Sequence, residues 1–202
     1  MKFADGKRSD IERNITRLSN NLGITATSLT YMVVTYDRAD FTQYAVVTRP
    51  PRPFHEVPAD GIATAVGGVA LFLPLADCTG AILYDPVNHA VMVSHLGRHS
   101  VEQQGALASV NFMRDQFGSE PRNLLVWLGP SPNSEAYPLW KRDNMSLIEA
   151  NQRDLIQAGV QRSHIEASSV DTVLNRDYFS HSEFLKGRRT KDGRFAIIAQ
   201  LM

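Results

Sequence analysis

Cys78, the only cysteine of the chain, and His95 are the residues whose types could perform chemistry together. A thiolate beside an imidazole is a nucleophile with its base, and one sulfur with one nitrogen can also bind a metal ion. A single cysteine cannot form an internal disulfide, so its thiol is left for burial, metal binding or catalysis. Burial as a small apolar side chain is the simplest alternative, and the histidine partner favours function over it.

The two residues flank a predicted hairpin. Apolar runs at 80–84 and 90–94 indicate strands, and they are separated by Asp85-Pro-Val-Asn88, which is typical of a type I turn. Whether the loop is 86–87 or 85–88, this register places Cys78 directly opposite His95 on one face. The Cβ atoms would then lie about 4.5–5.5 Å apart. A one-residue bulge would break this pairing.

His95 also precedes a predicted helix. Ser100-Val-Glu-Gln103 has the form of a capping box, and apolar residues at helical spacing follow as far as Phe117, before Gly118. Residues 95–100 would then form a strand-to-helix turn whose free N–H groups suit an anion or oxyanion. We therefore expect substrate contacts from four neighbours, each of which has an ordinary loop or cap role as its alternative: Asp77, Arg98, His99 and Ser100.

The remaining pattern predicts a mixed α and β protein. Helices are expected from residue 9 to 22 and from 146 to 158, with Gly23 and Gly159 as stops. Strands are expected at 29–36, 44–48, 69–73, 124–128 and 195–201, and the proline-rich stretch 49–58 is expected to be a loop. His181 lies near Arg188, Arg189 and Arg194, where a solvated loop is favoured over a phosphate clamp.

Composition narrows the class of protein. The 202 residues, 43% of them hydrophobic, are enough for one core, so we expect a single domain over 1–202. Lysine plus arginine equals aspartate plus glutamate at 21 each, which provides no field to attract nucleic acid or a membrane surface. With no apolar segment long enough to span a bilayer and no signal-peptide pattern, we expect a cytoplasmic protein.

Several motifs together resemble those of the laccase-domain (YfiH-like) family. They cover most of the chain from about residue 9 onward. The first four include the residues discussed above: Ala59-Asp-Gly-Ile-Ala-Thr64, Leu75-Ala-Asp-Cys78, Leu83-Tyr-Asp-Pro86 and His95-Leu-Gly97. The others follow in the family order: Leu128-Gly-Pro-Ser131, the helix from Ile148 to Val160, Asp171-Thr172, Tyr178-Phe-Ser180 and Gly193-Arg194.

The resemblance implies a four-layer α/β/β/α sandwich with mixed sheets, an α+β fold similar to the Cys–His deamidase domain of cytotoxic necrotizing factors. It implies activity on purine nucleosides, by phosphorolysis or by deamination of adenosine. Older polyphenol oxidase labels and a peptidoglycan-editing hydrolase role belong to the same family. The partners implied are a nucleoside and phosphate, and a homo-oligomer is compatible with it. The family also implies zinc or copper on two histidines and one cysteine, for which Cys78 and His95 match two ligands.

The chain departs from the family at this site. The first family histidine, from a Gln-x-His-Gly motif, has no counterpart, and Tyr36 or Asp37 stands at its place. A catalytic zinc site usually has three protein ligands, so Asp37, His99 or His55 would have to substitute. The family turn His-Ala-Gly-Trp-Arg-Gly has become His95-Leu-Gly-Arg-His-Ser100, and the family's N-terminal Thr-Arg-x-Gly-Gly strand is absent.

Three hypotheses remain open. The first is a purine nucleoside-acting enzyme that uses Cys78 and His95. The second is a metal-free Cys–His amide hydrolase, and the third is a catalytically weakened binding or partner subunit that retains the scaffold.

Overall fold

The computed structural model describes residues 8–49 and 53–202, and its strands form two mixed sheets. The smaller sheet has the order β10-β5-β1-β3 and the larger the order β2-β4-β7-β6-β8-β9. The strands are β1 Leu29–Val33, β2 Tyr44–Val46, β3 His55–Pro58, β4 Gly61–Thr64, β5 Ala70–Leu75, β6 Thr79–Asp85, β7 Ala90–Leu96, β8 Leu125–Leu128, β9 Ile165–Ala167 and β10 Phe195–Gln200.

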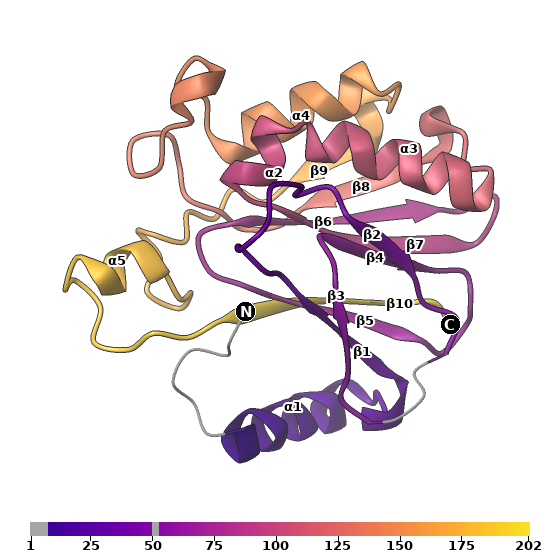
Figure 1. Ribbon diagram of the computed structural model, residues 1–202, viewed down its shortest axis with the longest axis horizontal. Coiled ribbons are helices and arrows are strands. Elements are labelled where there is room, and N and C mark those ends of the chain that lie inside the picture. The colour runs from indigo at the N-terminus through magenta and orange to yellow at the C-terminus, as the bar shows by residue number, and fades with distance from the viewer. Residues whose placement is uncertain (1–7, 50–52) are drawn as a thin grey trace.

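Helices cover the outer faces of the two sheets, as Figure 1 shows. The α-helices are α1 Arg8–Leu22, α2 Arg98–Glu102, α3 Gly105–Phe117, α4 Leu147–Gln157 and α5 His181–Leu185. Helix α1 packs on the smaller sheet, and α3 and α4 pack on the larger one. The expected four-layer sandwich is therefore confirmed. Among the described residues, none of these helices has the length and apolar character needed to cross a bilayer.

The main core lies between the sheets because the central strands are apolar on both faces. All seven residues of β7 are buried, and Val91 and Val93 face the smaller sheet while Met92 faces the helices. Strand β5 supplies Leu71 and Leu73 to the same inter-sheet layer. Fully buried strands carry near-continuous apolar runs, which is why these strands could be predicted from the sequence.

The hairpin of β6 and β7 has a different register from the predicted one. Gly80, and not Cys78, pairs with His95, and Asp85 pairs with Ala90, so the loop is 86–89. The Asp85 carboxylate accepts hydrogen bonds from the N–H groups of Val87 and Asn88, and His89 has a φ of 51°. The left-handed backbone of His89 lengthens the turn. The predicted direct opposition of Cys78 and His95 is therefore wrong.

The predicted capping box at Ser100 is also wrong. Helix α2 begins at Arg98 after Gly97, and it ends before Gln104, which has a φ of 56°. A Cβ on Gly105 would lie 1.9 Å from the Ser100 Oγ, so the start of α3 lies close against α2 at a glycine. By contrast, the helices over 9–22 and 146–158, and the one that ends at Gly118, are confirmed, and Ser146 forms the capping box of α4.

The proline-rich stretch is only partly a loop. Residues 50–52 lie outside the described part of the chain, and His55–Pro58 forms strand β3, which pairs with β1. The strand lies at the edge of its sheet, where a proline need not donate to a second neighbour. Strands β4 and β9 and helix α5 were not expected, because each has five residues or fewer.

Candidate active site

Cys78 and His95 lie close together despite the changed register. His95 alternates with Val93 along β7 and so faces the inter-sheet layer, while Cys78 stands just before β6, outside its paired residues, and packs against the same inter-sheet cluster. A Cβ on Gly97 would come within 2.8 Å of the Cys78 Sγ and 3.2 Å of the His95 Nε2. The thiol and the imidazole therefore border the same small space, which a larger residue at 97 would fill.

A cavity of about 310 Å³ opens over this pair. It is lined by all six residues expected from the sequence, namely Asp77, Cys78, His95, Arg98, His99 and Ser100. Residues that the motifs did not single out as contacts complete it: Tyr36, Phe41, Ala76, Gly97, Tyr137, His181, Ser182 and Leu185. The volume falls at the lower end of the range for small-molecule sites.

Burial keeps both members of the pair neutral. It raises the pKa of the Cys78 thiol to about 12, and the charge of Asp77 acts in the same direction. Burial also lowers the pKa of His95 to about 4, with further contributions from Arg38 and His99. At neutral pH the site thus holds a thiol and a neutral imidazole, which carries one proton and one lone pair.

Four buried polar atoms around the cavity have no protein partner. They are the Asp77 Oδ1, the His95 Nδ1, the Arg98 Nε and the Ser100 Oγ. Most buried polar side-chain atoms in proteins are hydrogen-bonded, and an unsatisfied one costs about 1–3 kcal/mol. Four of them around one cavity indicate a binding site for a ligand that offers several polar groups.

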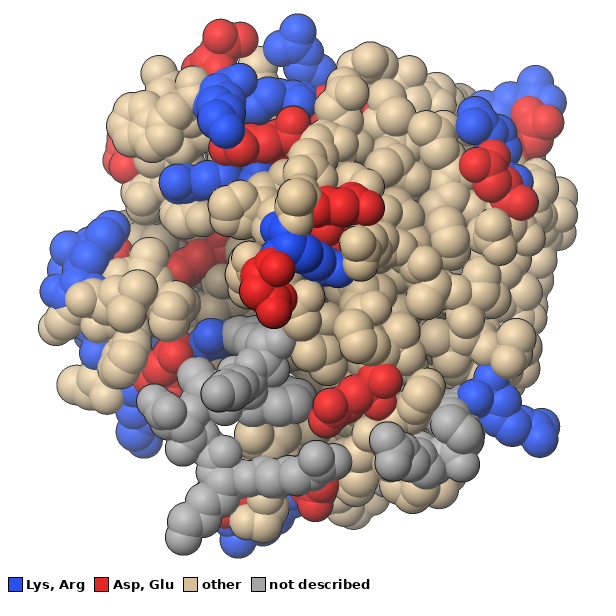
Figure 2. All heavy atoms as spheres, viewed as in Figure 1, with Lys and Arg blue, Asp and Glu red and all other residues tan. Residues whose placement is uncertain are grey.

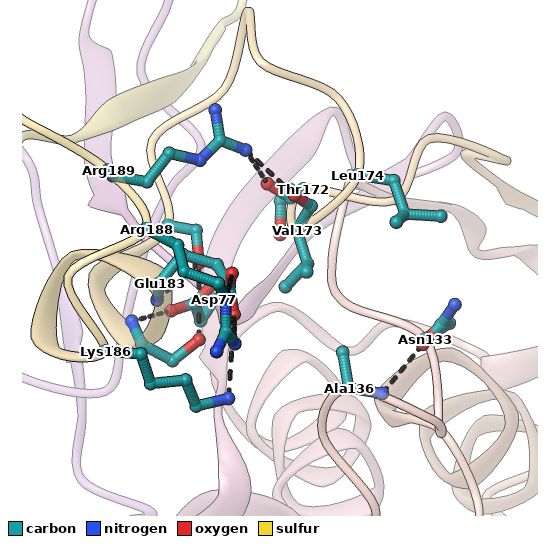
Figure 3. Close-up of polar contacts among 12 residues, drawn as sticks. Asp77, Asn133, Ala136, Thr172, Val173, Leu174, Glu183, Lys186, Arg188 and Arg189 are labelled. Atoms are coloured by element: carbon teal, nitrogen blue, oxygen red, sulfur yellow. Dashed lines mark hydrogen bonds and ion pairs between the residues drawn. The ribbon is translucent and has the colours of Figure 1, made fainter.

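Two of these residues are held in place by their other contacts. Asp77 has a φ of 63°, and its Oδ2 accepts a 2.6 Å hydrogen bond from the Ser182 N–H. This bond leaves the Oδ1 of the same carboxylate without a protein partner. Figure 3 shows Asp77 beside α5. The Arg98 guanidinium lies 4.3 Å from the centre of the Tyr137 ring, a cation–π contact. The cavity is therefore preorganised on its polar side.

Aromatic rings form another part of the wall. Phe41 stacks on His99 at 4.7 Å and 21°, and Tyr36 meets the rings of His95 and His99 edge-on, at 6.4 and 6.3 Å. The loop that carries Tyr36 and Phe41 is tied to the helix side by Gln103, which accepts from the Phe41 N–H and donates to the Ala39 carbonyl. Such rings suit a flat, partly apolar ligand.

The residues present do not fit a three-ligand metal site. In the described ranges 8–49 and 53–202, no three His, Cys, Asp or Glu side chains gather as metal ligands would. Of the two residues at the place of the first family histidine, Tyr36 lines the cavity and Asp37 does not line it, and His99 is stacked on a phenylalanine. His55 lies on edge strand β3 of the other sheet. No chemical step is therefore assigned to a metal.

His181 has a partner that the sequence did not reveal. Its Nδ1 lies 3.1 Å from the Asp192 Oδ2, and Arg194 binds the other oxygen of Asp192 at 2.7 Å. Asp192 therefore holds the His181 ring and the Arg194 guanidinium together beside the cavity. The sequence shows these two residues only as a pair 11 positions apart, His181 at the start of the short helix α5 and Asp192 in the loop after it.

The comparisons with known proteins agree with this architecture. A purine nucleoside phosphorylase of Mus musculus is 30% identical over 176 residues, which are 85% of this chain and 39% of that protein. One from Streptomyces coelicolor is 28% identical over 181 residues, covering 81% of this chain and 73% of that one. The chain thus spans about two fifths of the length of the mouse relative.

A solved structure and a family model complete the comparison. The crystal structure of the hypothetical protein YfiH from Bacillus licheniformis superposes with a TM-score of 0.86 at 22% identity, covering 100% of this chain and 85% of that chain. The family model described as multi-copper polyphenol oxidoreductase laccase matches residues 2–143 and 132–202. The motifs, the fold and the family model agree with one another, so the chain belongs to the multi-copper polyphenol oxidoreductase laccase family.

Proposed function

We propose that this protein acts on purine nucleosides in the Cys78–His95 cavity, with phosphorolysis as the reaction. The observation that carries the proposal is the group of four unpartnered polar atoms beside aromatic walls in one cavity. A purine offers a flat ring to the aromatic side chains, and ribose and phosphate offer hydroxyl and oxyanion groups to the polar ones. The names of several relatives, purine nucleoside phosphorylases, support the same substrate class.

The residues of the cavity suit the charges of this reaction. In phosphorolysis a phosphate oxygen bonds to C1′ of the ribose, and the bond from C1′ to the purine nitrogen breaks. The purine leaves with the electron pair and receives the proton that the phosphate gives up. A neutral His95 can accept that proton on one ring nitrogen and donate the proton that its other nitrogen carries, and Arg98 can bind the phosphate. Asp77 would accept from a ribose hydroxyl or a ring N–H.

Product analysis distinguishes the reactions open to such a site. Purified protein is incubated with adenosine, inosine or methylthioadenosine, each with and without phosphate, and the products are separated by chromatography. Phosphorolysis predicts release of the free base only with phosphate, whereas deamination converts adenosine to inosine in either buffer. The Cys78→Ala variant shows whether the thiol takes part, and the His95→Ala variant is the control. No release of free base by the wild type, or release no greater than that of His95→Ala, would exclude the proposal and leave a binding or partner subunit.

A metal-free amide hydrolase is a second candidate function. Cys78 and His95 lie close together, and a cysteine with a histidine forms the catalytic dyad of such enzymes. That reaction needs a thiolate with a lowered pKa. The burial of Cys78 acts in the opposite direction.

Alkylation kinetics test this second candidate. Because burial raises the Cys78 pKa to about 12, we expect iodoacetamide to react slowly at pH 7 and the rate to rise about tenfold per pH unit, without a plateau below about pH 11. Mass spectrometry of the modified protein measures this, and a small exposed thiol is the reference. Fast alkylation at pH 7 that His95→Ala abolishes would instead establish the hydrolase dyad.

A further inference from the structure

A second cavity, of about 280 Å³, lies in the segment around α5, and no residue lines both it and the first cavity. Its walls include the four cationic side chains Arg176, Arg188, Arg189 and Lys191 and the two aromatic ones Tyr178 and Phe179. Figure 1 shows α5 at one end of the sandwich, away from the helices that cover the larger sheet. The proposed nucleoside reaction makes no use of this cavity.

The Arg189 side chain is fixed without being neutralised. Its Nη2 donates to the backbone carbonyls of Thr172, Val173 and Asn175, at 3.4, 2.9 and 3.2 Å. Figure 3 shows the side chain reaching toward the first two of these residues. Carbonyl oxygens carry no net charge, so the guanidinium keeps its positive charge in a defined position, with other N–H groups free for an anion.

The other cations of the cavity differ in their partners. Arg188 is paired with both carboxylate oxygens of Glu183, which Lys186 also approaches at 3.5 Å (Figure 3). In the described part of the chain, neither Arg176 nor Lys191 forms an ion pair.

The segment that contains the cavity has more basic than acidic residues. The segment 176–194 contains six basic residues, Arg176, Lys186, Arg188, Arg189, Lys191 and Arg194, and three acidic ones, Asp177, Glu183 and Asp192. Asp192 is occupied by Arg194 and His181. The chain as a whole has equal numbers of the two signs, so this segment is locally basic within a neutral protein.

Aromatic side chains lie next to these charges. Phe179 is 37% exposed, while Tyr178 is held edge-on against Phe195, with ring centres 5.1 Å apart. A Cβ on Gly193 would come within 2.5 Å of the Phe179 ring, so only a glycine at 193 lets this partly exposed ring lie so close to the backbone. An exposed ring beside fixed cations is the combination that binds a base and its phosphates.

We propose that this cavity is a binding site for a free nucleotide, with its phosphates on the cationic side chains and its base on Phe179. A nucleic acid would need a basic track longer than one cavity. On the face shown in Figure 2, basic and acidic side chains are interspersed in small groups, and no continuous basic track crosses it. The site is independent of the nucleoside reaction, because the two cavities share no lining residue.

Calorimetric titration of the full chain with ADP tests this site. The double variant Arg176→Gln with Lys191→Gln removes two exposed cations that hold no other side chain, and we expect it to weaken ADP binding at least about tenfold. The matched control, Arg153→Gln with Arg162→Gln, makes the same charge change at another surface cavity and should stay within about twofold. Circular dichroism melting checks that both variants fold.

Two further titrations separate the sites and the ligand classes. A Cys78→Ala variant should bind ADP as the wild type does, and inorganic pyrophosphate should compete with ADP while adenosine should not. Equal affinities in the two double variants, binding that is lost in Cys78→Ala, or no ADP binding at about 1 mM would overturn the proposal. Tighter binding of a single-stranded oligonucleotide than of ADP would also overturn it, in favour of nucleic acid.

Discussion

Replacing His95 with alanine is expected to lower kcat/KM for the preferred nucleoside by about 10²–10⁴-fold, the usual contribution of a positioned acid or base. The imidazole is buried, its Nδ1 has no protein partner, and its Nε2 borders the space beside the Cys78 thiol. Steady-state kinetics with inosine and phosphate measure the effect. His55→Ala is the control, because that histidine lies on edge strand β3 of the other sheet.

The pH profile gives the same prediction a second readout. Burial lowers the His95 pKa to about 4, so the imidazole stays neutral as the pH falls through 6.5, where an exposed histidine would be half protonated. Activity that needs the neutral ring should therefore persist to about pH 5 and decline as the pH approaches 4. A rate unchanged by His95→Ala, or a wild-type rate that halves near pH 6.5, would contradict this role.

A Tyr36→His substitution is expected to create a zinc site. The Tyr36 ring centre lies 6.4 Å from that of His95, and both side chains line the cavity with Cys78, so a histidine at 36 would be a third ligand. Zinc sites with four ligands bind with about 10–16 kcal/mol, so one added ligand should raise affinity by at least about 100-fold. Tyr36 is 54% exposed, so the fold should tolerate the change.

Competition with a zinc chelator measures this effect. Tyr36→Phe is the matched control, because it keeps the ring and adds no ligand. The thermal midpoint gives an independent reading, since a ligand at 100 times its Kd stabilises the folded state by about 2.7 kcal/mol. If the wild-type protein binds zinc as tightly as Tyr36→His does, Cys78 and His95 suffice as protein ligands. That result would contradict the conclusion that the cavity lacks a zinc site.

The layers of the fold could be predicted because the buried strands and capped helices carry strong local signals. The apolar runs around Leu71 and Val93, and the capping box at Ser146, each lie within one element. Strand β3 could not be predicted, because its pairing with β1 depends on its place at the edge of a sheet.

The candidate site was predictable in composition and less so in geometry. The turn after Asp85 is longer than its sequence suggests, because the side-chain hydrogen bonds of Asp85 and the left-handed His89 are seen only in the folded loop. The error in register was two residues, which leaves Gly80 opposite His95 and places Cys78 just before the paired part of β6. The two side chains still border the same space beside Gly97.

The aromatic wall could not be inferred from sequence patterns. Phe41 and Tyr137 lie in loops, where no periodicity shows which way a side chain points. Their positions depend on long-range contacts, such as the one from Gln103 to Phe41 and the stacking of Arg98 on Tyr137. The same contacts shape the cavity, so its fit to a flat ligand became visible only in the structure.

A crystal structure of the protein with inosine and phosphate tests most directly whether nucleosides bind in the Cys78–His95 cavity. The expected result is a purine beside Tyr36 and Tyr137, with ligand atoms about 2.7–3.2 Å from the Asp77 Oδ1 and the His95 Nδ1. Phosphate should lie against Arg98. Nucleoside bound elsewhere at saturating concentration, with these polar atoms still unpartnered, would contradict the proposed function.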